Sequence, residues 1–164
     1  MNRTHLAVVG LILATLVSCS SDGGKADSHI DFCLAAQSAK DAEDAQQRLF
    51  SQSLSPPAAD VQPAVEGFAT KFAAMAALAP AEIKADVDTI SNAAQGLLAV
   101  VKASNYDVTA MVTTPEFATL TDTFSSSAFT AAQDSFRSYV ASTCGITITT
   151  EAVPTSDLTT TSGS

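Results

Sequence analysis

Residues 61–101 read VQPAVEGFATKFAAMAALAPAEIKADVDTISNAAQGLLAVV, and this stretch decides the fold. Its larger apolar residues recur at alternating intervals of four and three, which aligns them along one face of an α-helix. The first stripe consists of Val61, Val65, Phe68, Phe72, Met75 and Ala79, and the second of Ile83, Val87, Ile90, Ala94, Leu97 and Val101. Only a very short connection around Pro80 separates the two stripes, so the sequence predicts two helices packed antiparallel.

Capping residues and prolines mark where the first three helices begin and end. Residues 28–31 have the spacing of a capping box, and the helix that follows extends to about Leu54, where two prolines stop it. Asp60 is the predicted N-cap of the second helix. Pro80 is the predicted first residue of the third helix.

The C-terminal half continues the helical pattern after a break at residues 104–113. Thr114-Pro115-Glu116 combines an N-cap, a proline at the first position and an acidic first turn. The serines at 125–127 leave open whether this last helix is continuous or split, and Gly145 after Cys144 fits a left-handed cap. The predicted fold class is all-α, an up-down four-helix bundle.

The N-terminus has the features of a secretory signal. The apolar run at residues 6–16 is too short to span a bilayer as a helix, which takes about 20 residues. Leu16-Val17-Ser18-Cys19 follows it and resembles the lipobox of bacterial lipoproteins. The resemblance implies a diacylglyceryl thioether on Cys19 and removal of residues 1–18. The alternative is an ordinary signal peptide, cleaved at a small residue, in which Cys19 is incidental.

Lipid on Cys19 would hold the protein at the extracytoplasmic face of the cell membrane, because two acyl chains anchor stably where one binds only marginally. Residues 19–28 are polar and form a predicted flexible tether. Residues 29–146 form the predicted helical domain. Residues 147–164 are rich in serine and threonine and form a predicted disordered tail, with O-glycosylation as an alternative use.

The chain has three cysteines, and if Cys19 carries lipid, two remain that can pair with each other. In an oxidising compartment, Cys33 and Cys144 predict a disulfide, with two buried free thiols as the alternative. An up-down bundle of four helices brings the start of the first and the end of the last to the same end. Both cysteines lie at those places, so the topology and the disulfide support each other.

The body of the chain also resembles small secreted or lipid-anchored proteins of actinobacteria. The stretch APAEIKADV at 79–87 and the ending YVASTCGI at 139–146 carry this resemblance. Together with Phe32-Cys33 they cover most of residues 31–146. The motifs are structural, so the resemblance implies a helical domain and adds no activity.

The chain is acidic, with a net charge of −9 that becomes −10 when Arg3 is removed with the signal. The acidic residues of the first helix, Asp41, Glu43 and Asp44, are predicted to lie mostly away from the core. A chain without a basic cluster does not fit nucleic acid, nor electrostatic adhesion to anionic lipid. The predicted partners are the membrane, through lipid on Cys19, and an unidentified envelope protein or a small apolar ligand.

Residues that carry chemistry are sparse. His29 is the single histidine after the signal, too few for a zinc site or for a Ser-His-Asp arrangement. Asp86 and Asp88 point about 200° apart on a helix and cannot share a proton. Glu82 and Asp86, one turn apart with Lys84 nearby, are typical of a solvated face. The sequence therefore predicts no catalytic, cofactor-binding or metal-ligating residue.

Phenylalanine supplies nearly all the aromatic rings, at positions 32, 50, 68, 72, 117, 124, 129 and 136. These rings are predicted to fill the core, because alanine-rich helices need large side chains between them. The alternative is a pocket for an apolar ligand. The predicted function is a non-catalytic binding or structural role at the cell envelope. The alternatives are a carrier of a small apolar ligand, which needs a cavity of roughly 300 Å³ or more, and, less favoured, a hydrolase.

Overall fold

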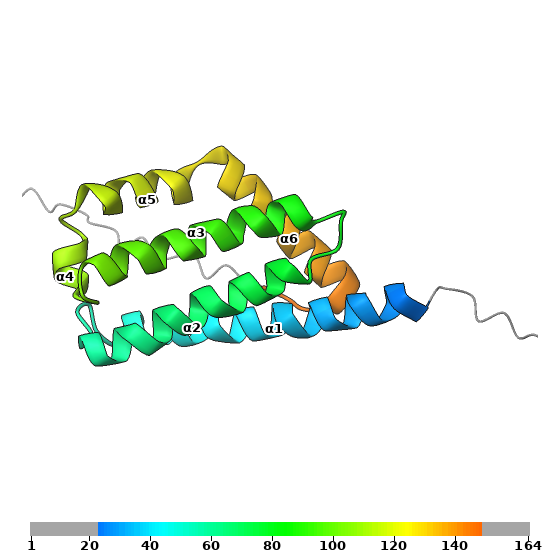
Figure 1. The fold of residues 1–164 in the computed structure, drawn as a ribbon, viewed down its shortest axis with the longest axis horizontal. Coiled ribbons are helices and arrows are strands. Elements are labelled where there is room, and N and C mark those ends of the chain that lie inside the picture. The colour runs from blue at the N-terminus through cyan, green and yellow to red at the C-terminus, as the bar shows by residue number, and fades with distance from the viewer. Residues whose placement is uncertain (1–22, 149–164) are drawn as a thin grey trace, which may run out of the picture.

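The computed structural model describes residues 23–148. Within this range the chain forms helices and no strands, which confirms the predicted all-α class. The helices are α1 (Gly23–Gln52), α2 (Ala58–Ala77), α3 (Lys84–Ala103), α4 (Val108–Met111), α5 (Pro115–Ser125) and α6 (Ser127–Cys144) (Figure 1). The lipobox-like residues with Cys19, the predicted signal segment and residues 149–164 lie outside the described residues.

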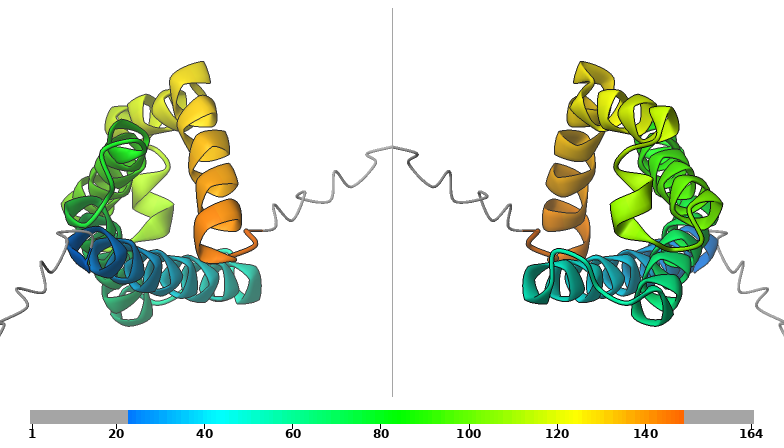
Figure 2. Two further views of the ribbon diagram at one scale, coloured as in Figure 1. Left: turned by 90° about the vertical axis from the view of Figure 1, so that its right-hand side faces the viewer. Right: turned by 90° about the vertical axis from the view of Figure 1, so that its left-hand side faces the viewer.

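The three long helices α1, α2 and α3 run antiparallel to their neighbours along the molecule (Figure 1). The short α4 turns the chain, and α5 runs back along α3. The end views show that α6 then crosses steeply from the end of α5 to α1 (Figure 2), and it packs against α3 as well as α1. The last predicted helix is therefore two segments with different directions.

Two groups of buried apolar side chains stabilise this arrangement. The larger one lies toward the end where α6 meets α1, and its bulkiest members are Phe32, Phe72, Met75, Ile83, Val87, Ile90, Phe129, Phe136, Val140 and Ile146. The smaller one lies toward α4 and consists of Val61, Val65, Val101 and Met111. Both predicted stripes contribute to both groups, so the spacing in residues 61–101 identified the buried faces of α2 and α3 correctly.

The predicted starts of the first three helices are wrong. No proline precedes residue 28 in α1, and Lys25 and Ala26 favour helix, so α1 extends back to Gly23 and residues 28–31 form no cap. The Pro57 carbonyl accepts the N–H of Asp60 at 2.9 Å, so α2 has already begun there. The Pro80 carbonyl accepts the N–H of Ile83 at 3.1 Å in a turn, which delays α3 to Lys84.

The predicted helix start at Thr114 and helix end at Gly145 are confirmed, and the serine run, for which the sequence left two possibilities open, is a break. Thr114 Oγ1 accepts the Phe117 N–H at 3.2 Å and caps α5. Ser126 Oγ caps α6 in the same way, so the serine run splits the last helix. Gly145 ends α6 with φ 67°, a conformation that glycine adopts without steric cost. The predicted break at 104–113 contains one helical turn, α4.

A disulfide joins Cys33 on α1 to Cys144 at the end of α6, as the sequence predicts, with the two Cα atoms 5.4 Å apart. Beyond it the chain stays against the domain. Ile146 is buried, and Ile148, which the sequence places in the tail, is half-buried against the larger core group. Among residues 23–148, no helix is both long and apolar enough to cross a bilayer.

Candidate functional site

A pocket of about 120 Å³ opens between the helices around the larger core group. Its apolar wall is made of phenylalanine rings from α2, α5 and α6, joined by aliphatic side chains from α3 and from the segment after α6. These residues are Phe68, Phe72, Phe124, Phe129, Phe136, Ile90, Ala94 and Ile148. The remaining lining is polar and comes from Glu43, Gln133 and Arg137.

Two local features bring the rings together. Phe68 and Phe72 are one turn apart on α2, and their ring centroids lie 4.5 Å apart. Phe124 and Phe129 flank the break between α5 and α6 and meet edge to face at 5.0 Å. Since the Ser126 cap creates this break, it also positions two of the five rings.

The polar part of the pocket is centred on Glu43, which is half-buried rather than on the solvent-facing side that the sequence predicts. Burial raises the pKa of the Glu43 carboxyl, and the neighbouring Asp44 carboxylate raises it further. The Arg137 guanidinium, which also donates to Asp134 Oδ1 at 3.3 Å, lowers the pKa of Glu43. The pocket thus joins an apolar wall to a carboxyl, an amide and a cation.

A shallow groove adjoins the pocket along α1. It has a volume of about 340 Å³, is lined by Gln46, Gln47 and Phe50, and shares Glu43 and Phe68 with the pocket. An elongated molecule with one end in the pocket has room to continue in this direction.

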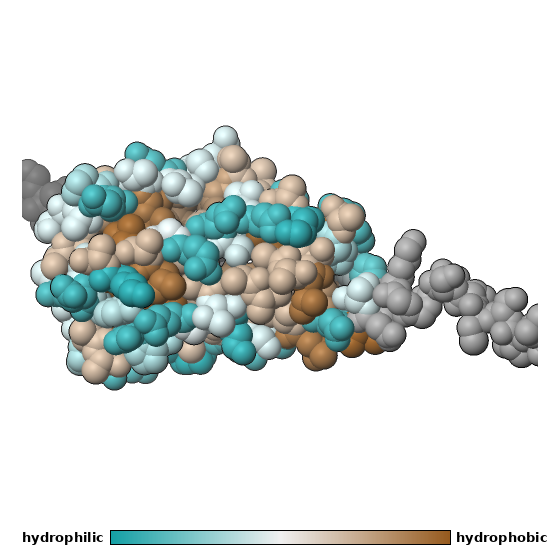
Figure 3. All heavy atoms as spheres, viewed as in Figure 1, coloured by the Kyte–Doolittle hydropathy of each residue, from teal (hydrophilic) through white to brown (hydrophobic). Residues whose placement is uncertain are grey.

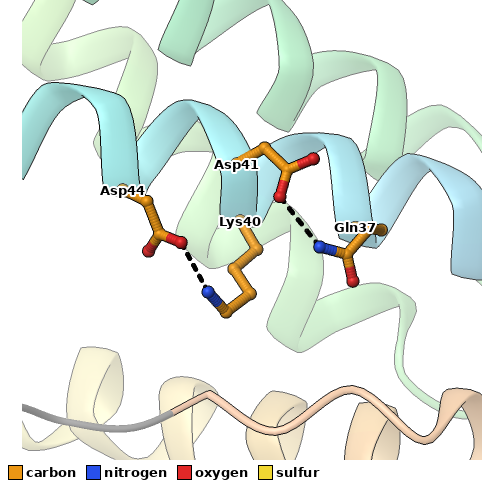
Figure 4. Close-up of polar contacts among 4 residues, drawn as sticks. All are labelled: Gln37, Lys40, Asp41 and Asp44. Atoms are coloured by element: carbon orange, nitrogen blue, oxygen red, sulfur yellow. Dashed lines mark hydrogen bonds and ion pairs between the residues drawn. The ribbon is translucent and has the colours of Figure 1, made fainter.

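The other acidic residues of this part of α1 form hydrogen bonds with residues of the same helix (Figure 4). Lys40 Nζ donates to Asp44 Oδ2 at 2.6 Å, and Gln37 Nε2 donates to Asp41 Oδ1 at 2.8 Å. Both contacts join residues four apart on one helix, and such pairs contribute little to stability. Of the acidic trio, only Glu43 therefore belongs to the pocket.

His29 lies in a separate polar cluster near the disulfide. The Tyr139 hydroxyl donates to Glu82 Oε1 at 3.0 Å and lies 3.3 Å from His29 Nδ1. Because a phenol has one hydrogen, its oxygen accepts from His29 when it donates to Glu82. Burial raises the pKa of the Tyr139 hydroxyl, and the Glu82 carboxylate raises it further. The phenol is therefore held protonated, which suits a structural donor rather than a nucleophile.

The remaining candidates for chemistry are placed apart or paired with other side chains. Asp88 forms an ion pair with Lys84 one turn away, on the polar side of α3. In the part of the chain that the structure describes, no three His, Cys, Asp or Glu side chains form a group that could hold a metal ion. The Phe-lined pocket is thus the best-formed candidate site.

The sequence identified the rings but not the polar lining. Gln133 and Arg137 are one turn apart on α6 beside the Phe129 and Phe136 stripe, so helical spacing contained part of the signal. The sequence around Glu43 gave no sign that this residue lines a pocket, because the polar residues beside it there, Gln133 and Arg137, lie on α6. No protein-family model, curated protein or solved structure matches this chain.

Proposed function

We propose that this chain is a non-catalytic binding protein, anchored by lipid to the extracytoplasmic face of the cell membrane, whose Phe-lined pocket receives an apolar group of its partner. The observation that carries the proposal is the pocket itself, in which five phenylalanine rings face a polar edge of Glu43, Gln133 and Arg137. Binding sites typically combine an apolar wall with a few converging polar groups.

The volume of the pocket bears on what it takes. A cavity of about 120 Å³ is close to the ~150 Å³ of an engineered cavity in another protein that binds benzene, and well below the ~300 Å³ of a typical ligand site. The fitting group is therefore one ring or one branched alkyl group, such as an apolar side chain of an envelope protein.

The second candidate function, a carrier of a small apolar ligand, is favoured by the groove that adjoins the pocket. Such a ligand would place one end among the rings and lie past Phe68 toward Phe50. It would be partly exposed to solvent, unlike a ligand enclosed in the bundle.

The lipid anchor is supported by the lipobox-like residues Leu16-Val17-Ser18-Cys19. The disulfide is consistent with the same location, because disulfides persist in oxidising compartments outside the cytoplasm. We also propose that the α5–α6 pair takes the place of the fourth helix in one up-down bundle. The contacts of α6 with both α1 and α3 support this.

The anchor is tested by Cys19→Ser in the full chain. The variant should move from the membrane fraction to the soluble extracytoplasmic fraction, since the diacylglyceryl group with its two acyl chains no longer attaches. Cys33→Ser with Cys144→Ser is the matched control, which should stay with the membrane. A Cys19→Ser variant that still fractionates with membranes would contradict the anchor.

Pocket binding is tested with p-cresol, which combines one ring and one hydroxyl. The isoleucine methyl groups are isotope-labelled and followed by NMR. Ile90 and Ile148 line the pocket, so their methyl resonances should shift saturably as p-cresol is added, while the resonance of the exposed Ile30 should not shift. Ala94→Leu fills the pocket and should abolish the shifts of both reporters. Ala93→Leu is the matched control, because Ala93 is buried in the same core group and does not line the pocket.

Circular dichroism melting shows whether the Ala94→Leu and Ala93→Leu variants are folded. Phe124→Ala removes one of the five rings that line the pocket and provides a second test, because it should weaken p-cresol binding. Shifts that do not saturate in the wild-type protein, or that persist unchanged in Ala94→Leu and Phe124→Ala, would refute the pocket as the binding site.

A further inference from the structure

Two large apolar side chains are exposed on the first part of α1. Ile30 is 58% exposed and Leu34 is 64% exposed. They are one turn apart, on the side of the helix opposite the buried residues Phe32, Ala36 and Ala39. They are therefore not needed to pack α1 against α2 or α6.

These two side chains border a shallow groove between α1 and the end of α6. The groove has a volume of about 410 Å³. Ile146 and the Cys33–Cys144 disulfide give it an apolar floor, and His29, Gln37 and Thr143 complete its edge. The result is a mainly apolar, solvent-open surface, which we call the α1 groove.

The α1 groove lies at the end of the molecule where α1 begins, and apolar atoms are exposed at this end (Figure 3). In the sequence Cys19 is four residues before Gly23, so full extension separates them by at most about 14 Å. Ile30 follows seven residues later, about 10 Å along a helix. A lipid on Cys19 would therefore hold this end of the domain beside the membrane surface.

We propose that Ile30, Leu34 and the α1 groove rest in the bilayer interface, so that the partner of this surface is the lipid membrane. The inference rests on the proposed lipid anchor. The anchor keeps these side chains at a high effective concentration near the bilayer. A few exposed apolar side chains are therefore enough for contact, although they could not recruit the protein from solution. After the signal and Arg3 are removed, the net charge changes from the −9 of the full sequence to −10, which opposes attraction to anionic headgroups, so the contact is apolar and does not need anionic lipid.

The protein contains no tryptophan, so a single introduced indole reports on one position. Leu34→Trp places it in the α1 groove. Leu54→Trp is the matched control, because Leu54 is 97% exposed in the connection between α1 and α2, toward the opposite end. Both variants, processed and lipidated on Cys19, are reconstituted into phosphatidylcholine vesicles, with or without bromine on the acyl chains, after circular dichroism has shown native helix content.

Brominated acyl chains should remove a large part of the Leu34→Trp fluorescence and leave Leu54→Trp emission unchanged. Equal, weak quenching of both variants would overturn the inference. A blue-shifted Leu34→Trp emission that bromine does not quench would also overturn it, because the groove would then hold the protein's own acyl chain. Vesicle flotation separates the two proposals. Failure to float overturns the anchor and this inference together, while flotation without quenching overturns this inference alone.

Discussion

Cys33 and Cys144 are separated by 111 residues in the sequence, and their disulfide holds the two Cα atoms 5.4 Å apart. Direct packing between α1 and α6 is limited compared with that of α1 against α2. The disulfide therefore fixes the steeply inclined α6 onto α1 (Figure 2). Ile146 and Ile148 follow Cys144 closely and pack against the larger core group, and Ile148 lines one side of the pocket.

Replacing both cysteines by alanine should lower the free energy of unfolding, with a ceiling near 4.7 kcal/mol from the entropy of closing so long a loop. Urea unfolding followed by circular dichroism measures the loss. Wild-type protein treated with dithiothreitol is the matched control and should lose a similar amount. Equal stability of the double variant and the oxidised wild type would show that the disulfide does not restrain the unfolded chain.

The parts of the fold that depend on local sequence could be predicted. The spacing of Val61, Val65, Ile83 and Val87 identified buried faces, since helical periodicity depends only on the chain itself. The break at residues 125–127, which the sequence left open, is equally local, because the hydrogen bond of Ser126 is to a backbone N–H three residues away.

The direction of α6 and the role of Glu43 could not be predicted in this way. A helical wheel places Glu43 on one side of α1 but does not say which helix approaches that side. The tilt of α6 brings Gln133 and Arg137 there. The starts of α2 and α3 were misplaced because neighbouring residues offer competing signals. Pro57 precedes the first residue of α2, so the helix begins before Asp60, and Pro80 begins a turn rather than a helix.

Glu43→Gln should stabilise the protein at neutral pH. The pKa of Glu43 is raised in the folded state, chiefly by burial, so the folded protein binds this proton more tightly than the unfolded chain. Ionisation therefore costs stability between the ordinary carboxyl pKa and the raised one, and the full cost persists above both. Below the ordinary pKa the cost vanishes, because the carboxyl is protonated in both states.

Thermal unfolding at a series of pH values checks this prediction. The stability gain of Glu43→Gln should be largest at neutral pH and disappear under acid conditions. Asp41→Gln, an exposed position on the same helix, is the control for removing one negative charge. A gain that is the same at every pH, or no larger than that of Asp41→Gln, would contradict the assigned cause.

Tyr106 should stabilise the domain in a way that depends on the ionisation of Glu66. The Tyr106 backbone is left-handed, with φ 62°, and its hydroxyl donates to Glu66 Oε1 on α2 at 2.6 Å. This hydrogen bond, with a second from Gln62, lowers the pKa of Glu66, and the same bond raises the pKa of Tyr106. A bond to the charged carboxylate is stronger than one to the neutral acid.

A depressed carboxyl pKa contributes stability that is fully present above the ordinary carboxyl pKa and is lost as pH falls through the folded value. Tyr106→Phe keeps the ring and the backbone but removes the donor. It should be less stable than the wild type at neutral pH, and the difference should shrink as Glu66 is protonated. Glu66→Gln, which keeps an acceptor without the charge, should remove the pH dependence of the difference between Tyr and Phe. A Tyr106→Phe deficit that is constant from neutral to acid pH would show that the hydroxyl stabilises the domain independently of the Glu66 charge, and the absence of any deficit would show that the ring alone contributes at this position.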